Sequence, residues 1–462
     1  MKKAFRVFVL IITMLGTNLY SSLSLAALTP PDILNLLADN NYSALDRIII
    51  AQQKLHENGI NNEKAILLTL DAFHSSNDGI EKQLNRWVAN NPKAYPAYLA
   101  RGAHYVHIAS LHRGAKFSKD TKKQQFVRMA NYHKRAIKDF GKALNLNRKL
   151  LYAYSMLVRV ATSSGSWADI VKLSDAGLGV DPASYLMHRQ IMFKFQPKWG
   201  GYKGFIDSWL ELKIKPHLKK NPLLKTLFGY PDYILADKMN RKNKFIKSEQ
   251  YFNDSIEKSS SDYNVLFLEN RGEYYFYRGD YKKAIHDFDK VLLQNPYYIS
   301  SLKLRGRALT LTGRHDEALR DLNMAISLDQ NNPGLRRARS YVYRKDKMYK
   351  EALVDSKASL KFGLHNNNNW RNQGYILLYG MNDYKGAEIA YKKAVELYPD
   401  SETSWYQLGV AKYKQFSCDF IKPMKVYLKM CKKRKCDKSL VEWSASVSAM
   451  AVSKGFCKTS EK

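Results

Sequence analysis

Apolar residues return along this chain at intervals of three or four positions, and short polar segments separate one apolar run from the next. That spacing places the apolar side chains on one face of an α-helix, so the pattern predicts an all-α fold. The helices come in pairs. Within residues 265–296, Gly272 and Ala284 are small enough to let two helices approach closely, and Pro296 ends the second helix because proline cannot donate to the helical ladder.

The pair within 265–296 returns with a period of 34 residues. One shift moves Gly272 onto Gly306, and a second shift moves it onto Ser340. A fourth copy, 370–399, has one extra residue at its inner turn, and a fifth copy follows. A single hairpin cannot bury its own apolar face, so consecutive hairpins are expected to stack into a solenoid.

These copies resemble the tetratricopeptide repeat (TPR) over residues 265 to about 415. The resemblance implies an α-solenoid, a TPR superhelix of roughly ten helix-turn-helix hairpins. We expect a regular C-terminal half and an irregular N-terminal half, where the same phase is fainter. Two stretches break the period upstream: about 22 residues inserted before Ala136, and residues 183–260.

The N-terminal half is similar to a bacterial domain family of unknown function, which also precedes TPR hairpins in exported proteins. The similarity spans about residues 30 to 205 and implies no known activity. Lys198 and Tyr202 depart from the usual pattern, and Pro197–Tyr202 is either a tight turn or a functional loop. The matching residues are Trp87, Val88, Pro92, Arg101, Gly102, Arg113, Gly114, Pro197, Trp199, Gly200 and Gly201.

The first residues predict export. A positive region from Lys2 to Arg6 is followed by an apolar run from Val7 to Leu15, and small residues precede a cleavage position after Ala26. The apolar run is short for a membrane span, so we expect a removed signal peptide rather than an uncleaved anchor. The mature protein would then be soluble and exported, with the periplasm favoured over secretion.

The targeting segment and the repeat phase divide the chain into four parts. They are a signal peptide (1–26), an irregular TPR-like helical domain with insertions (27–262), a regular TPR array (263–416) and a C-terminal helical cap with two disulfides (417–462). The cap holds all four cysteines, and in an oxidising compartment an even number predicts disulfides. Of three connectivities we favour Cys418–Cys457 with Cys431–Cys436, because two antiparallel helices would bring each pair together. A zinc site is the competing interpretation, but the usual paired spacing of zinc ligands is missing.

The formal charge of +33 implies anionic partners. Three clusters, 113–135, 194–225 and the segment from Cys418 onward, carry much of the surplus. For an exported protein nucleic acid is a poor partner, and we expect none. Binding to anionic lipid headgroups, binding to cell-wall polymers and simple solvation all stay open.

Residues with catalytic or metal-binding chemistry are few. His104, His107 and His112 lie close in sequence, but no Asp, Glu or Cys stands at ligand spacing beside them, so we expect structural or surface roles and no metal. No nucleophile motif or nucleotide fingerprint is present, which favours a protein that is not an enzyme and uses no cofactor. We expect Asp287 and Asp289, a carboxylate pair on one repeat helix, to be solvated.

The TPR resemblance also implies where a partner would bind. In that family the first helix of each hairpin lines the concave surface. Here the lining positions begin with Glu269, Glu273 and Tyr277, and from Lys303 onward basic residues alternate with tyrosines. Arginine binds a carboxylate through two parallel hydrogen bonds, and tyrosine offers a rigid amphipathic surface. The carboxylate clamp of the family is not matched, because Arg307 stands where asparagine is usual. The candidate groove residues are Lys303, Arg307, Arg337, Tyr341, Arg344, Arg371, Tyr375, Tyr379 and Tyr406.

These observations favour an exported adaptor that binds an acidic or carboxylate-bearing segment of a protein partner. The simplest competing interpretation is that the lining side chains are only the solvated face of a basic protein. Three more functions stay open: an envelope protein that docks on anionic lipid or glycan, a neutraliser of a secreted toxin, and an enzyme whose site assembles from distant residues. Salt separates docking from groove binding, because attraction between exposed charges weakens as ionic strength rises.

Overall fold

The computed structural model describes residues 28–60, 62–114, 121–196, 201, 204–259, 263–363, 366–453 and 457. Within these ranges every regular element is a helix, which confirms the predicted all-α fold. The predicted signal peptide and most of the Pro197–Tyr202 loop lie outside the described residues.

The N-terminal half is a run of antiparallel helices that share a continuous apolar core. Its helices are α3 (Pro30–Ala38), α4 (Tyr42–Glu57), α5 (Glu63–Asp71), α6 (Ile80–Asn90), α7 (Tyr95–Arg113), α8 (Lys123–Leu146), α9 (Leu151–Ser164), α10 (Trp167–Val180) and α11 (Tyr185–Lys194). A less regular segment follows, with α12 (Phe205–Trp209), a π-helical stretch (Leu210–Ile214), two 3-10 segments (Lys215–His217 and Pro222–Gly229), α13 (Tyr230–Arg241) and α14 (Phe245–Lys258).

The C-terminal half consists of five hairpins in the predicted frame, closed by one further helix. The hairpins are α15 (Val265–Arg278) with α16 (Tyr281–Gln294), α17 (Ile299–Leu311) with α18 (His315–Leu328), α19 (Pro333–Lys345) with α20 (Tyr349–Gly363), α21 (Asn367–Tyr375) with α22 (Tyr384–Leu397), and α23 (Glu402–Tyr413) with α24 (Ile421–Cys431). The last helix is α25 (Lys438–Ser453).

The two helices of each hairpin cross at the small residues that the sequence singled out. A Cβ atom on Gly272 would lie 2.8 Å from the ring of Phe288, and the hydrogen that glycine carries instead allows this close approach. Ala284 packs beside this crossing with no exposed surface. The extra residue of the fourth copy lies in a π-helical turn, Ile376–Gly380, because a π-turn holds one residue more than an α-turn.

A repeated ion pair joins the two helices of the regular hairpins. Arg271 donates from Nε and Nη2 to both carboxylate oxygens of Asp287, at 2.8 and 2.6 Å. From Nη1 it also donates to Asn253 on the preceding hairpin, at 2.7 Å. Each arginine therefore clamps its own hairpin and ties it to its neighbour. The same bidentate contact recurs in the next two copies as Arg305–Asp321 and Arg339–Asp355.

We call each of these bidentate arginine–aspartate pairs a rung. One prediction about their carboxylates is wrong. The Asp287 side chain is only 1% exposed, so the expectation that it is solvated was wrong. Asp289 is about half exposed, and it accepts a hydrogen bond from Arg305 of the next hairpin at 2.6 Å. Both carboxylates thus hold the array together, one within a hairpin and one between hairpins.

The N-terminal half contains a rung of the same kind. Arg101 on α7 binds both oxygens of Asp139 on α8, at 2.8 and 2.7 Å, and its Nη1 reaches Asn85 on α6 at 3.0 Å. The two partners are 38 residues apart, against 16 in the regular hairpins. The difference is the predicted insertion of about 22 residues, and it lengthens this hairpin: α7 has 19 residues and α8 has 24.

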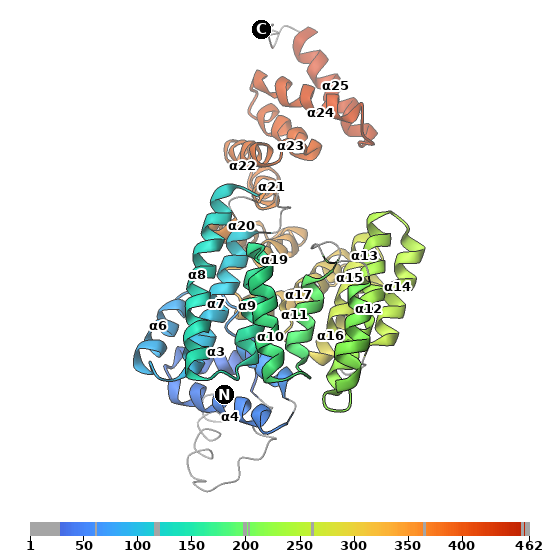
Figure 1. Ribbon diagram of the computed structural model, residues 1–462. Helices are drawn as coiled ribbons and strands as arrows, with labels where there is room; N and C mark the ends of the chain where they lie inside the picture. Colours follow the sequence, from blue (N-terminus) through green and yellow to red (C-terminus); the bar gives the residue numbers. More distant parts are fainter. Residues whose placement is uncertain are drawn as a thin grey trace.

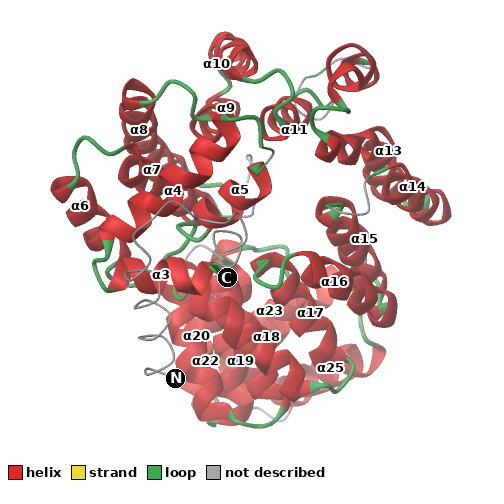
Figure 2. Ribbon diagram, turned by 90° about the horizontal axis from the view of Figure 1, so that it is seen from below, coloured by secondary structure: helices red, strands yellow, loops and turns green. Residues whose placement is uncertain are grey.

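The solenoid turns back on itself, so that residues far apart in sequence meet. Seen from below, the helices from α6 to α18 follow one another around a ring, and α3 contacts α18 (Figure 2). The turn after α5 packs on the turn after α18: Ser76 N donates to Asp329 Oδ1 at 2.8 Å, and Asn331 Nδ2 donates to Ser76 O at 2.7 Å. The last hairpins, α21 to α25, stack above this ring (Figure 1).

The centre of this closing contact is a buried carboxylate, Asp329. Burial alone would raise its pKa, but the charge of His107 and hydrogen bonds from His107, Ser76 and Asn332 lower the pKa to about 2. His107 Nε2 lies 3.1 Å from Asp329 Oδ2, and His104 Nδ1 lies 2.9 Å from Ser75 O. These two histidines therefore support the contact between the halves.

The four cysteines form two disulfides in the C-terminal cap. Cys418 is joined to Cys457, and Cys431 is joined to Cys436, which is the nested pairing that the sequence analysis favoured. The first bond links a 3-10 segment just before α24, Cys418–Phe420, to the chain beyond α25, and the second closes the turn between the two helices. Together they hold α25 against α24.

Candidate partner-binding surface

The first helices of the hairpins form the inner side of the solenoid. Successive first helices contact one another, in the pairs α7–α9, α9–α11, α15–α17, α17–α19 and α19–α21. Second helices such as α10 and α14 lie outside them (Figure 2). Side chains on the free face of the first helices therefore point toward a shared interior.

Three predicted groove residues gather on adjacent first helices. Lys303 and Arg307 lie on α17, Arg337 lies on α19, and all three are half-buried. In the described part of the chain no carboxylate comes within 4.0 Å of any of them. Arg337 donates to Asn369 at 2.7 Å, and the Arg307 guanidinium lies 4.5 Å from the centre of the Phe276 ring. We call Lys303, Arg307 and Arg337 the basic triad.

The basic triad is electrostatically crowded. Burial lowers the pKa of Lys303, the charges of Arg307 and Arg337 lower it further, and Glu269 and Glu273 act in the opposite direction. Burial and the charge of Arg307 lower the pKa of Arg337 to about 10. A bound anion would relieve this repulsion, so the triad can hold a carboxylate by charge-assisted hydrogen bonds.

A cation between aromatic rings continues this surface toward the C-terminus. The Arg344 guanidinium lies 4.0 Å from the ring centre of Tyr375 and 4.8 Å from that of Tyr341. The ring centres of Tyr375 and Tyr379 are 4.7 Å apart. This arrangement holds the arginine in place and leaves flat, amphipathic surface beside it.

The remaining predicted groove residues contact the protein itself. Arg371 Nη1 lies 3.3 Å from Asn368 Oδ1, and the Tyr379 hydroxyl donates to Gln407 at 2.7 Å. Tyr406 packs against Tyr427 and Trp443 of the C-terminal cap, with ring centres 5.2 and 5.9 Å apart. Tyr406 thus joins the groove to the cap, and its ring offers less surface to a partner.

The sequence analysis named no groove residue in the N-terminal half, but the inner surface continues there. Arg159 on α9 is exposed, and Arg189 on α11 is half-buried. Pro182 ends the α9–α10 hairpin at the same place as Pro296 ends α15–α16, so the sequence already contained the frame that assigns Arg159 and Arg189 to inner positions. The irregular helices between the two halves hid this correspondence.

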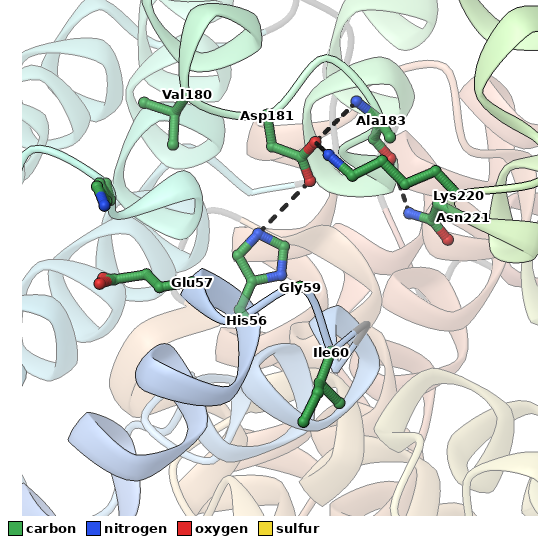
Figure 3. Close-up of a pocket in the computed structure, with 10 residues that line it drawn as sticks. His56, Glu57, Gly59, Ile60, Val180, Asp181, Ala183, Lys220 and Asn221 are labelled. Carbon is green, nitrogen blue, oxygen red and sulfur yellow. Dashed lines mark hydrogen bonds and ion pairs between the residues drawn. The ribbon is translucent and has the colours of Figure 1, made fainter.

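A separate pocket of about 170 Å³ lies where α4 ends beside the α10–α11 turn (Figure 3). Its central charges pair with one another: Asp181 accepts from Lys220 Nζ at 2.7 Å and lies 3.6 Å from His56 Nε2. Asn221 Nδ2 donates to Ala183 O at 2.8 Å. These contacts join α4 to the irregular segment, and we place the candidate site on the inner surface instead.

Two further findings concern the described residues. The described residues contain no group of three or more His, Cys, Asp or Glu side chains placed to hold a metal ion. None of their helices has both the length and the apolar character needed to cross a membrane.

The architecture is a helical solenoid of stacked hairpins, and family comparisons name its parts. Residues 30–190 match a domain of unknown function, DUF4034, and residues 265–298 and 370–401 match the tetratricopeptide repeat. The chain therefore carries a DUF4034 domain followed by tetratricopeptide repeats. Tetratricopeptide repeats support a protein–protein interaction scaffold.

Individual similar proteins are distant. A TPR repeat-containing protein of Methanocaldococcus jannaschii is 25% identical over an alignment of 202 residues that covers 39% of this chain. The match covers 35% of that protein, so the chain spans about a third of the curated relative. A tetratricopeptide repeat protein from Parabacteroides merdae covers 66% of this chain and 100% of its own, at 13% identity and a TM-score of 0.39. YrrB, a TPR protein with an unusual peptide-binding site, covers 42% and 97% at 16% identity and a TM-score of 0.33.

Proposed function

We propose that this chain is an adaptor that holds an acidic or carboxylate-bearing segment of a protein partner on the inner surface of its C-terminal hairpins. The basic triad carries the proposal, because it is a half-buried cluster of three cations with no carboxylate of the described chain within 4.0 Å. A cluster of this kind costs free energy in the unbound protein and gains it when an anion binds.

The neighbouring side chains extend this binding mode. Arg344 lies between Tyr341 and Tyr375, where a planar or aromatic partner side chain can stack on the exposed faces. The partner segment would run from the basic triad toward α21, with acidic groups at one end and apolar or aromatic groups at the other. Recognition would involve no covalent step.

We further propose that the protein works after export, in the periplasm. The two disulfides support an oxidising compartment. A second candidate function, docking on an anionic envelope surface, is favoured by α8. The only acidic residue of α8, Asp139, is buried in a rung, while Lys123, Arg128, Lys134 and Lys142 are exposed.

The test is a binding measurement with a defined probe. The probe is a short fluorescein-labelled peptide of alternating Glu and Tyr, and fluorescence anisotropy reports its binding. Arg307→Gln combined with Arg337→Gln should weaken binding about tenfold or more, because each charge-assisted hydrogen bond contributes about 1.5–3 kcal/mol.

The matched control removes the same charge elsewhere. Arg47 and Arg148 are exposed, and Arg47→Gln with Arg148→Gln should leave the affinity nearly unchanged. Equal losses in the two double variants would mean that the probe senses only net charge, and the groove assignment would then be wrong. Raising the salt concentration distinguishes groove binding from docking on an anionic envelope surface. Docking through the exposed cations of α8 would be screened strongly and would weaken more.

A further inference from the structure

The N-terminal half contributes two inner-surface cations that the proposed function does not use. Arg159 lies on α9 and Arg189 on α11, and the charge of Arg189 acts directly on Arg159. No carboxylate of the described chain comes within 4.0 Å of either guanidinium. Arg159 is exposed to solvent, and burial together with the charge of Arg189 lowers its pKa.

This arginine pair stands in the same repeat register as part of the basic triad. Arg159 and Arg189 are 30 residues apart, as are Arg307 and Arg337. In both pairs the first arginine is the ninth residue of one first helix, and the second arginine is the fifth residue of the next first helix. The solenoid therefore presents two cation pairs built in the same way at two places on its inner surface.

Tyrosines and one carboxylate surround the arginine pair. Tyr185 packs edge-to-face on Tyr263 with ring centres 6.1 Å apart, and the Tyr152 hydroxyl lies 3.4 Å from His74 Nε2. Asp71 on α5 lies close enough for both arginines to lower its pKa, although burial raises the pKa to about 6. His74 Nδ1 lies 3.2 Å from Asp71.

A cavity opens beside this group. It has a volume of about 240 Å³, and it lies between α5 and the turn from α16 to α17. Asp71, His74 and Tyr298 are among its lining residues, and Tyr298 is also within electrostatic reach of Arg159. The arginines do not line this cavity themselves, but two of its lining residues, Asp71 and Tyr298, are within electrostatic reach of Arg159.

We propose that Arg159 and Arg189 form a second binding site for a peptide carboxylate, inside the ring that the Asp329 contact closes. Arginine pairs suit carboxylates, and the surrounding tyrosine rings suit the apolar parts of a peptide. Asp71 competes with the incoming carboxylate and keeps the net charge of the unbound site low. A partner with two acidic groups would then be held at two places, by the arginine pair and by the basic triad.

This proposal rests partly on the proposed function, but its own test reads the N-terminal site directly. In the wild-type chain, phenylglyoxal modifies accessible arginines, and mass spectrometry gives the rate at each one. Saturating acidic probe peptide should slow the modification of Arg159 several-fold, whereas a Lys/Tyr peptide of the same length should not. Unchanged reactivity of Arg159, or equal protection by inorganic phosphate at the same concentration, would overturn the assignment to a peptide carboxylate.

Variants separate the two sites. Arg307→Gln with Arg337→Gln should leave the protection of Arg159 in place, whereas Arg159→Gln with Arg189→Gln should remove one class of bound peptide from a calorimetric titration. If Arg159 is protected while the triad variant binds as wild type does, the proposed function fails and this inference stands. If the triad variant binds weakly and Arg159 is never protected, the proposed function stands and the second site is wrong.

Asp71→Asn tests whether the arginines only neutralise Asp71. A competing carboxylate weakens anion binding, so its removal should tighten probe binding several-fold while the fold is kept, as judged by circular dichroism. A structural ion network would respond in the opposite way, with a lower melting temperature and no gain in affinity. That result would overturn the second site.

Discussion

The two halves of this protein differ in their helices but share the contacts between them. The N-terminal hairpin α7–α8 is long and carries an insertion, whereas the C-terminal hairpins follow the 34-residue frame closely. Both halves nevertheless use the same arginine–aspartate rung and the same glycine crossing. Arg101 is followed by Gly102 just as Arg271 is followed by Gly272.

The difference lies on the inner surface. In the N-terminal half two arginines lie within electrostatic reach of Asp71 and several tyrosines, whereas in the C-terminal half three cations lie together and Glu269 and Glu273 act on one of them, Lys303. Contacts between helices are constrained by packing, so they stay alike when a hairpin is lengthened. Side chains on the inner face touch few neighbours, so they can differ from hairpin to hairpin and set what each part binds.

The largest expected effect tests whether the rungs are equivalent in the two halves. Asp139→Asn and Asp287→Asn each leave an arginine that is less than a fifth exposed without its carboxylate partner, and each should destabilise its own half by about 3–5 kcal/mol. Hydrogen exchange measured by mass spectrometry gives the loss of local stability for each hairpin. This resolution is needed because a repeat array need not unfold in one step. Asp316→Asn, at the exposed start of α18, is the control. A large loss in only one half would show that the rungs are alike in geometry but not in energy.

The next effect concerns the contact that joins the halves. Asp329→Asn keeps the size of the side chain but removes the charge beside His107, so it should weaken the closing contact by about 1.5–3 kcal/mol. Exchange should rise in the turn after α5 and in the turn after α18 together. If hydrogen exchange rose only in the turn after α18, the two halves would not be coupled through Asp329.

The pH dependence of the same contact has a defined sign. The pKa of Asp329 is about 2 in the folded protein, below the ordinary value for aspartate. Its stabilising effect is therefore complete above about pH 4 and is lost as the pH falls through about 2. The wild type should lose this contribution over that window, whereas Asp329→Asn should lack that part of the pH response in a melting-temperature series.

The smallest effect compares the glycine crossings. A Cβ atom would lie 2.7 Å from Phe140 at Gly102 and 2.8 Å from Phe288 at Gly272. Gly102→Ala and Gly272→Ala should each cost about 1–3 kcal/mol through overpacking, measured by thermal denaturation. Gly141→Ala, where a Cβ would meet nothing within 4 Å, should be tolerated. A marked difference between the two crossings would mean that the insertion in α7–α8 has relaxed the packing of that hairpin.

The sequence alone was enough to predict the hairpins, their 34-residue period and the additional residue near Ile376, because each depends on the size, polarity or backbone properties of residues within one repeat. The rungs also leave a trace in the sequence, since Arg271 and Asp287 return together at the same period. A carboxylate on a helix is more often solvated, however, and that rule predicts the wrong environment for Asp287. Only the tertiary structure showed that Ser76 meets Asp329, 253 residues away, and that α3 contacts α18. Contacts across a closed superhelical turn depend on the summed angles of many hairpins, and no local pattern encodes that sum.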